Sequence, residues 1–237
     1  MTNNSTIKVI TFDLDDTLWQ LKPVIIEAEQ VVFNWLSEQA PKFGAHFSQQ
    51  SFSEWKWQRY NRQPPLANQI SQLRIDSMEQ ALLESGYTQS QAQQLASDAF
   101  AVFLQARHQV TLFDGVDSLL KDLHGRYSLG VLTNGNADIQ RLAIGSLFDF
   151  SFSAEQLNAS KPAADHFLAA QQISGARAEQ IIHIGDHIEH DVDGACLAGC
   201  HAIWFNPHKS PRPQRPHPFL EAFSLAEIPA LIASLEH

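Results

Sequence analysis

Residues 7–18 read IKVITFDLDDTL, a short, mostly apolar and β-branched run that ends abruptly in acidic residues. The run Ile7–Phe12 predicts a buried β-strand. Because side chains alternate along a strand, Asp13 and Asp15 would point the same way where the strand ends. Two neighbouring carboxylates repel each other, and a divalent cation would relieve that repulsion. This segment alone leaves an ordinary acidic turn open as the alternative.

Downstream of Gly115, apolar runs alternate with helical patterns. The chain has 237 residues, of which 44% are apolar, enough to bury a sizeable core. Strand–helix alternation predicts an α/β fold, a doubly wound parallel sheet to which the first strand also belongs. The expected strands are Ser128–Leu132, Phe150–Phe152, Ile181–Ile184 and His201–Phe205, and the expected helices are Val116–Leu123, Ile139–Leu147, Ala164–Gln172 and Asp191–Ala198.

The stretch between the first two strands is predicted to be helical throughout. Apolar residues recur at helical spacing in three separate segments, and no convincing strand pattern occurs between Leu18 and about Gln109. We therefore expect a core domain formed by residues 1–18 and 108–237, with an all-helical domain, residues 19–107, inserted into it.

Polar residues follow several of the predicted strands. Ligands of an open parallel sheet bind beyond the carboxyl ends of its strands. Thr133 and Asn134 follow the second strand and offer hydrogen-bond donors to an anion. Asp186 and Asp191 follow a later strand and again bring carboxylates to the sheet edge. These positions predict one site built from several strand ends.

A lysine belongs to the same set. Lys161 precedes a predicted helix that Pro162 would start, and a cation at a helix N-terminus is unfavourable for the helix dipole. This local conflict hints at a function for Lys161. His187 and His190 would allow a zinc site, but carboxylate-rich oxygen sites favour magnesium.

Composition narrows the class of partner. The net charge of −10 disfavours binding to nucleic acids and to anionic membranes, so we expect a small-molecule partner. Cys196 and Cys200 are the two cysteines, too few for a disulfide framework. The polar segment Met1–Thr6 lacks the apolar region of a signal peptide. Together these features predict a cytoplasmic protein, and the oligomeric state stays open.

With these motifs in order, the chain resembles the haloacid dehalogenase superfamily along essentially its whole length. Residues 12–18 match the first motif of the family, Thr133 the second and Lys161 the third, and Gly185-Asp186 with Asp191 matches the fourth. The helical insertion resembles the family's helical cap. The resemblance implies a Rossmann-like core and a magnesium-dependent phosphatase acting on a small phosphomonoester.

The resemblance also implies roles for three aspartates. Asp13 would attack phosphorus and form an aspartyl-phosphate. Asp15 would protonate the leaving alcohol and then activate the water that hydrolyses the intermediate. Mg²⁺ would be held by the carboxylates of Asp13 and Asp186 and by the backbone carbonyl of Asp15.

Four further residues take supporting roles by the same resemblance. Lys161 and Thr133 would neutralise and orient the phosphoryl oxygens, and the backbone N–H of Asn134 would assist them. Asp191 would support the metal site or Lys161 without binding the metal itself.

Longer stretches resemble a bacterial group of capped phosphatases that act on FMN and on the phosphorylated ribitylamino-uracil intermediate of riboflavin synthesis. Trp19, just after the first motif, is the aromatic residue expected to stack on the flat ring of such substrates. The stretches are Lys22–Ile25, Ser77–Leu83, Thr133–Ala137, Ser160–Pro162 and Phe167–Ala170.

Several alternatives stay open at this point. Sugar phosphates or nucleotides could be the substrates, and a phosphomutase or phosphotransferase would use the same aspartyl-phosphate. A true dehalogenase does not need the second acid, so Asp15 argues against it. A phospho-receiver is disfavoured because Asp13 and Asp15 share the first strand and a long helical insertion follows.

Overall fold

The computed structural model describes residues 6–62 and 68–236. The chain divides into two compact units. The core unit comprises Met1–Gln20 and Thr111–His237, and the helical unit comprises Leu21–Val110. None of the helices in the described part of the chain is both long and apolar enough to cross a membrane.

The core unit is built on a six-stranded sheet in the order β3-β2-β1-β4-β5-β6, with every pair of neighbours parallel. The central strand β1 is buried along its whole length, as expected for an apolar run between two neighbouring strands. Its neighbours β2 and β4 end close to it in register, so polar residues after the three strands meet. The strands are β1 Val9–Phe12, β2 Ser128–Thr133, β3 Phe150–Ser153, β4 Ile181–Gly185, β5 His201–Phe205 and β6 Leu220–Ala222.

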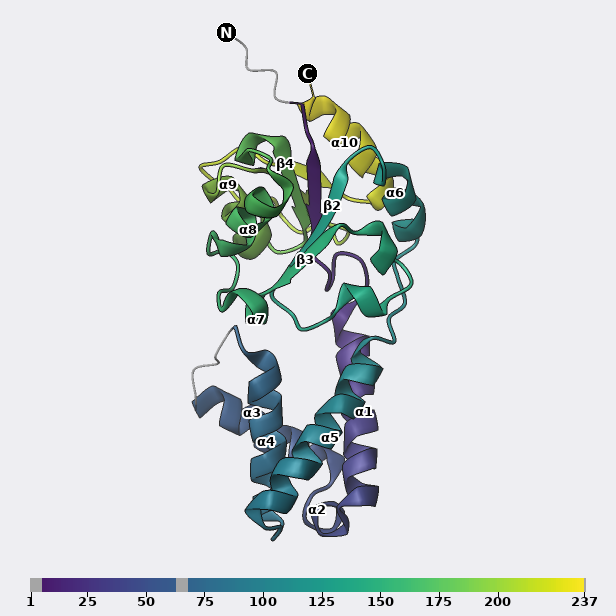
Figure 1. Cartoon of the computed structure of the whole chain (residues 1–237), viewed down its shortest axis with the longest axis vertical. Helices are drawn as coiled ribbons and strands as arrows, with labels where there is room; N and C mark the ends of the chain where they lie inside the picture. Colours follow the sequence, from purple (N-terminus) through teal and green to yellow (C-terminus); the bar gives the residue numbers. More distant parts are fainter. Residues whose placement is uncertain (1–5, 63–67, 237) are drawn as a thin grey trace. The chain divides into compact units, whose positions relative to one another are not determined.

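Helices cover both faces of this sheet (Figure 1), which confirms the predicted fold class. Figure 1 shows α8 and α9 on one side and α6 and α10 on the other. The apolar side of α8 packs through Phe167 into a core with Leu132 of β2 and Ile181 of β4. The helices of the core unit are α6 Val116–Leu123, α7 Ala154–Leu157, α8 Asp165–Ser174, α9 Gly194–Leu197 and α10 Ile228–Leu235.

The described residues of the helical unit form helices and no strand. A cluster of buried apolar side chains joins these helices, and it includes a chain of four phenylalanine rings in contact, of which Phe33 is partly exposed. Thr88 begins the last helix with a capping box, in which Thr88 and Gln91 each bond the other's backbone N–H. The helices are α1 Leu21–Gln39, α2 Pro41–His46, α3 Gln49–Arg62, α4 Ile70–Glu84 and α5 Gln89–Arg107.

Three predicted helices differ in the structure. Residues 139–147 form two 3₁₀ turns, η1 Ile139–Arg141 and η2 Gly145–Leu147, instead of one helix. The helix expected at Asp191 begins earlier, as the π-helical turn η4 Ile188–Asp193, and continues as α9. Pro162 does not start α8, because Ser160 and Ala163 close a turn through a backbone hydrogen bond (3.0 Å) and the helix begins after it.

Candidate active site

Two carboxylates from neighbouring strands face each other at the carboxyl edge of the sheet. Asp13 follows β1, and its backbone N–H donates to the carbonyl of Ile184 in β4 (2.9 Å), which extends the strand pairing by one residue. Asp13 is 8% exposed. Asp186 follows β4, and the hydroxyl of Thr17 donates to its Oδ1 atom (3.1 Å). Thr17 therefore ties the loop after β1 to the loop after β4.

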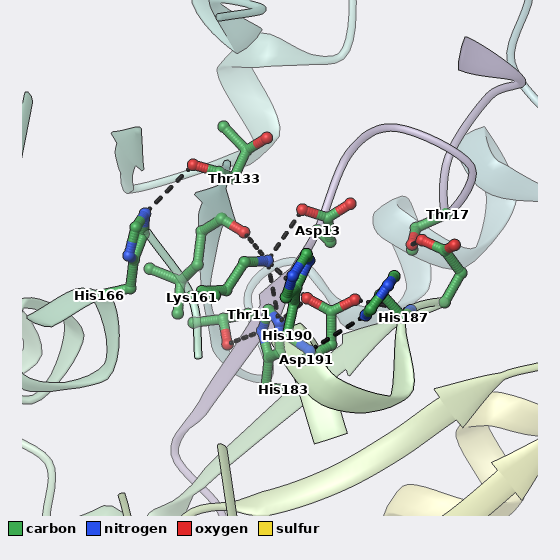
Figure 2. A network of polar contacts seen from close by, with 12 residues as sticks. Thr11, Asp13, Thr17, Thr133, Lys161, His166, His183, His187, His190 and Asp191 are labelled. Atoms are coloured by element: carbon green, nitrogen blue, oxygen red, sulfur yellow. Dashed lines mark hydrogen bonds and ion pairs between the residues drawn. The ribbon is translucent and has the colours of Figure 1, made fainter. Parts of the chain in front are cut away.

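A buried lysine links Asp13 to a third carboxylate, that of Asp191 (Figure 2). The ammonium group of Lys161 donates to Oδ1 of Asp13 (2.9 Å), to Oδ1 of Asp191 (2.6 Å) and to the backbone carbonyl of Leu132. The side chain of Lys161 is 1% exposed. A buried ammonium is costly unless all its protons find acceptors, and here all three do. Lys161 is thus held with its charge beside the predicted nucleophile.

Asn134 secures the backbone of that lysine. Its Nδ2 atom donates to the carbonyl of Lys161 (2.9 Å), and its Oδ1 atom accepts from the N–H of Lys161 (2.8 Å). Sequence reasoning expected only the backbone N–H of Asn134 to take part. The side chain instead fastens the Lys161 turn to the end of β2, which is a positioning role that the Asn-Gly pattern does not reveal.

Asp191 lies against the end of β4 because residue 185 is a glycine. A Cβ atom on Gly185 would lie 2.3 Å from Cγ of Asp191, so only glycine allows this approach. Oδ2 of Asp191 accepts from the backbone N–H of His187 (2.9 Å), while Oδ1 accepts from Lys161. Both oxygens are therefore occupied, which suits the predicted supporting role better than direct metal binding.

Two polar residues inside the strands complete the network and were missed by sequence reasoning. Nε2 of His183 in β4 lies 3.2 Å from Oδ1 of Asp191, and Nδ1 lies 2.9 Å from the hydroxyl of Thr11 in β1. The protons of Lys161 are already used, so we assign the Nε2–H of His183 as the donor to Asp191. The available signal was a polar residue in the middle of each of two apolar strands.

Thr133, the predicted phosphate ligand, ends β2 at the same edge of the sheet. Its hydroxyl accepts from the N–H of Gly135 (3.0 Å), and its backbone carbonyl accepts from Nε2 of His166 (3.1 Å). Figure 2 shows Thr133, Lys161 and Asp13 from neighbouring elements in one view. The structure thus brings these three predicted residues together.

The charges of the site explain the shifted pKa values. Burial lowers the pKa of Lys161, but the carboxylates of Asp13 and Asp191 outweigh burial and raise it above its ordinary value. Burial raises the pKa of Asp13, against the opposing effect of Lys161. Burial and the charge of Asp191 raise the pKa of Asp186 to about 7. Burial and Lys161 lower the pKa of His183 to about 4, so this imidazole is neutral.

The donor set fits a hard divalent cation. Carboxylate oxygens of Asp13, Asp186 and Asp191 lie within 4.8 Å of one another. Burial raises the pKa values of Asp13 and Asp186, and neighbouring carboxylates raise them further, so a bound cation would stabilise the charged forms of both. Asp191 accepts hydrogen bonds at both of its carboxylate oxygens, so we expect Asp13 and Asp186 to be the direct ligands. An all-oxygen set of this kind suits Mg²⁺.

Asp15 and Trp19 lie in the loop after β1. Asp15 is partly exposed, and its Oδ1 atom accepts from the indole Nε1–H of Trp19 (2.9 Å). The indole ring has no exposed area. This arrangement offers no open ring face to a substrate, so it does not support the stacking role expected for Trp19.

The histidines that suggested zinc stack on each other instead. The rings of His187 and His190 lie 3.9 Å apart between centroids and are nearly parallel. Nδ1 of His187 accepts from the backbone N–H of His190 (3.2 Å). This nitrogen therefore caps the η4 turn, a structural task that competes with metal binding.

Comparisons with known proteins agree with this geometry. Residues 7–199 match the family described as haloacid dehalogenase-like hydrolase. The chain is 31% identical over 231 residues to the 5-amino-6-(5-phospho-D-ribitylamino)uracil phosphatase YigB of Escherichia coli, covering 95% of this chain and 96% of that protein. It is 26% identical over 247 residues to a phosphoserine phosphatase of Thermus thermophilus, covering 94% and 98%.

A solved structure supports the same assignment. The crystal structure described as a 2-haloacid dehalogenase from Pseudomonas syringae has a TM-score of 0.89 and 40% sequence identity, covering 97% of this chain and 99% of that one. The family match spans most of the chain and includes every strand end described above except that of β5 and β6. This chain therefore belongs to the haloacid dehalogenase-like hydrolase family.

Proposed function

We propose that the protein hydrolyses small phosphomonoesters through a phosphoryl group carried on Asp13. The observation that carries this proposal is the buried Lys161 ammonium held between the carboxylates of Asp13 and Asp191. A phosphoryl group bound at Asp13 would lie beside this positive charge, in a site that is otherwise rich in carboxylates. The family match and the phosphatase relatives support the same reaction class.

The residues suggest a division of labour in two steps. A carboxylate oxygen of Asp13 attacks phosphorus, and the bond from phosphorus to the ester oxygen breaks. Asp15 gives its proton to the departing alkoxide, and then takes a proton from the water that hydrolyses the aspartyl-phosphate. Lys161 and the hydroxyl of Thr133 neutralise and orient the phosphoryl oxygens throughout.

A divalent cation completes this proposal. Asp13, Asp186 and the backbone carbonyl of Asp15 would hold Mg²⁺, which would screen the negative charges of nucleophile and phosphate. Asp191 would hold Lys161 through its Oδ1 atom and the loop after β4 through the backbone N–H of His187.

Removal of divalent cations should therefore stop phosphate release, and Mg²⁺ should restore it. Asp186→Ala should weaken Mg²⁺ binding measured by calorimetry, because it deletes one of two direct carboxylate ligands. Glu189→Ala is the matched control, since Glu189 is an exposed acid three residues away in the sequence. Full activity after exhaustive chelation, or equal Mg²⁺ binding by both variants, would count against the metal assignment.

For the substrate, we propose FMN and the phosphorylated ribitylamino-uracil riboflavin precursor. The resemblance of several stretches to the riboflavin-related phosphatases and the 31% identity to YigB support this choice. Both molecules carry a phosphomonoester on a flexible ribityl chain, which would let phosphate reach Asp13 while the ring lies farther out. Sugar phosphates and nucleotides are the alternative substrates.

A screen of phosphorylated metabolites tests the substrate. We expect kcat/KM for FMN and for the uracil precursor to exceed the values for ribose 5-phosphate and for nucleoside monophosphates. Release of inorganic phosphate from a single substrate separates a phosphatase from a phosphomutase. Specificity constants well below those of the sugar phosphates would refute the riboflavin assignment while leaving the phosphatase proposal intact.

Dehalogenation is the second candidate, because the solved structure described above carries that name. A halide leaves as a stable anion and needs no acid, whereas an alkoxide does. The presence of a second acid, Asp15, two residues after Asp13 therefore favours the phosphatase. Release of halide from 2-chloropropionate at a rate comparable to phosphate release would favour the dehalogenase.

A further inference from the structure

The loop after β1 contains a donor that is aimed at the predicted acid. The indole Nε1–H of Trp19 donates to Oδ1 of Asp15 at 2.9 Å, and the indole ring is fully buried. Asp15 itself is partly exposed. A carboxylate on a partly exposed loop ordinarily samples several rotamers, whereas a buried ring keeps one. The buried Trp19 ring therefore sets the orientation of the Asp15 carboxylate.

The backbone of Trp19 is anchored on both sides. Its carbonyl accepts from the N–H of Asp16 (2.7 Å), which closes the loop on itself. Trp19 also pairs with Leu112 as an isolated antiparallel bridge, and the carbonyl of Leu18 accepts from the N–H of Phe113 (2.8 Å). All of these residues belong to the core unit. The indole donor is thus fixed by contacts within the core unit alone.

We propose that Trp19 is a positioning residue that holds the Asp15 carboxyl group in the orientation needed for proton transfer to the leaving alcohol. This inference rests on the proposed phosphatase function, and assigns Trp19 a role different from ring stacking. The indole N–H is a neutral donor that keeps its proton. It occupies Oδ1 of Asp15 as an acceptor, so the proton that moves to the leaving oxygen is carried by Oδ2.

The value of such a contact depends on the leaving group. When phosphorus is transferred to Asp13, an alkoxide must be protonated as it departs, whereas p-nitrophenolate leaves as a stable anion. A misoriented Asp15 therefore slows alkyl esters and spares p-nitrophenyl phosphate. Losing one hydrogen bond to a charged group corresponds to about a ten- to hundredfold change in rate.

The test is Trp19→Phe, which keeps an aromatic ring and deletes the donor. The readout is kcat/KM, which reports on the step in which the ester bond breaks. Three substrates distinguish an effect of an aromatic ring in the substrate from an effect of the leaving group's basicity: p-nitrophenyl phosphate, 2-phenylethyl phosphate and ribose 5-phosphate. We expect kcat/KM to fall about ten- to hundredfold for the last two, through kcat, and to change little for p-nitrophenyl phosphate.

Other patterns would overturn the proposal. Loss confined to the two ring-bearing substrates would mean that Trp19 stacks on the substrate. Equal loss on all three would mean that it only packs. Wild-type protein that hydrolyses none of these three substrates, and neither FMN nor the uracil precursor, would refute the phosphatase function itself, independently of Trp19. If Trp19→Phe does not fold, Trp19→Met fills the space without a donor and is tested in the same way.

A double-mutant cycle and a crystal structure give further readouts. In an Asp15→Asn background, Trp19→Phe should cause no additional loss, because the function that it supports is already gone. In crystals of Trp19→Phe, the Asp15 carboxyl should occupy another rotamer or several. An unchanged Asp15 orientation, or fully additive losses, would contradict the proposal.

Trp55→Phe is the matched control. The indole N–H of Trp55 donates to Oε2 of Glu84 at 2.9 Å in the helical unit, so the same change deletes an equivalent hydrogen bond elsewhere. It should leave the ratio of kcat/KM between p-nitrophenyl phosphate and ribose 5-phosphate unchanged. A shift in that ratio equal to the shift in Trp19→Phe would show that the effect is not specific to Asp15.

Discussion

Replacing Asp13 with asparagine is expected to reduce phosphate release to the background of the assay while the protein stays folded. The amide has the shape of the carboxylate but cannot attack phosphorus. Lys161 would still bond Asp191 and the carbonyl of Leu132, so the buried charge would not be stranded. Phosphate release and thermal unfolding of the variant, measured side by side, check both parts of this expectation.

Asp16→Asn provides the control for that experiment. Asp16 lies in the same loop, is exposed, and has a φ of 58°, a backbone conformation that asparagine tolerates well. It therefore loses the same charge without losing a predicted nucleophile, and should stay active. Turnover by Asp13→Asn within tenfold of the wild type would rule out Asp13 as the nucleophile.

The second large effect is expected for Asp15→Asn. General acid–base assistance is worth about 10²–10⁴-fold, and the asparagine side chain can neither give nor take the proton. Rapid-quench kinetics with radiolabelled substrate should show slower formation and slower hydrolysis of a phosphoenzyme. The label should map to Asp13. Finding it on a serine or histidine, or a loss of less than tenfold on an alkyl phosphate, would be incompatible with the proposed roles.

The strands β1, β2, β4 and β5 could be predicted because each lies between two neighbours in the sheet and is largely buried. A strand covered on both faces reads as a continuous apolar run, and the runs Ile181–Ile184 and His201–Phe205 are of this kind. The strand β6 was not predicted, because three residues carry no detectable pattern. Its place at the edge of the sheet is decided by pairing with β5.

The error over residues 139–147 has a local cause. Apolar residues there recur at a spacing that suits a helix, but Asp138 caps a short turn by accepting from the N–H of Gln140. A Cβ atom on Gly145 would lie 2.5 Å from the carbonyl of Ile139, so the backbone folds back on itself at this glycine. Close approach between two backbone segments is a tertiary feature that periodicity does not contain.

The residues of the candidate site were likewise predictable only in part. The strand-end residues were predictable because parallel strands end at one edge of the sheet. The contacts that hold them were not predictable, because His183 contacts Thr11 and Asn134 contacts Lys161, and in both pairs the two residues are far apart in the sequence. The role of Trp19 could not be read from its position either, since only the folded loop shows that its N–H faces Asp15.

The bridge between Trp19 and Leu112 joins the residues just before and just after the helical unit, so it concerns the folding of the chain. The first residues of the core sheet pair with a strand that follows the whole helical unit, as Val9 with Ser128 shows. Closing so long a loop costs entropy that must be met before the sheet contributes stability. Helices α1 and α5, the first and last of the insertion, pack against each other. A helical unit that folds early would therefore shorten the effective loop and speed the meeting of β1 with β2.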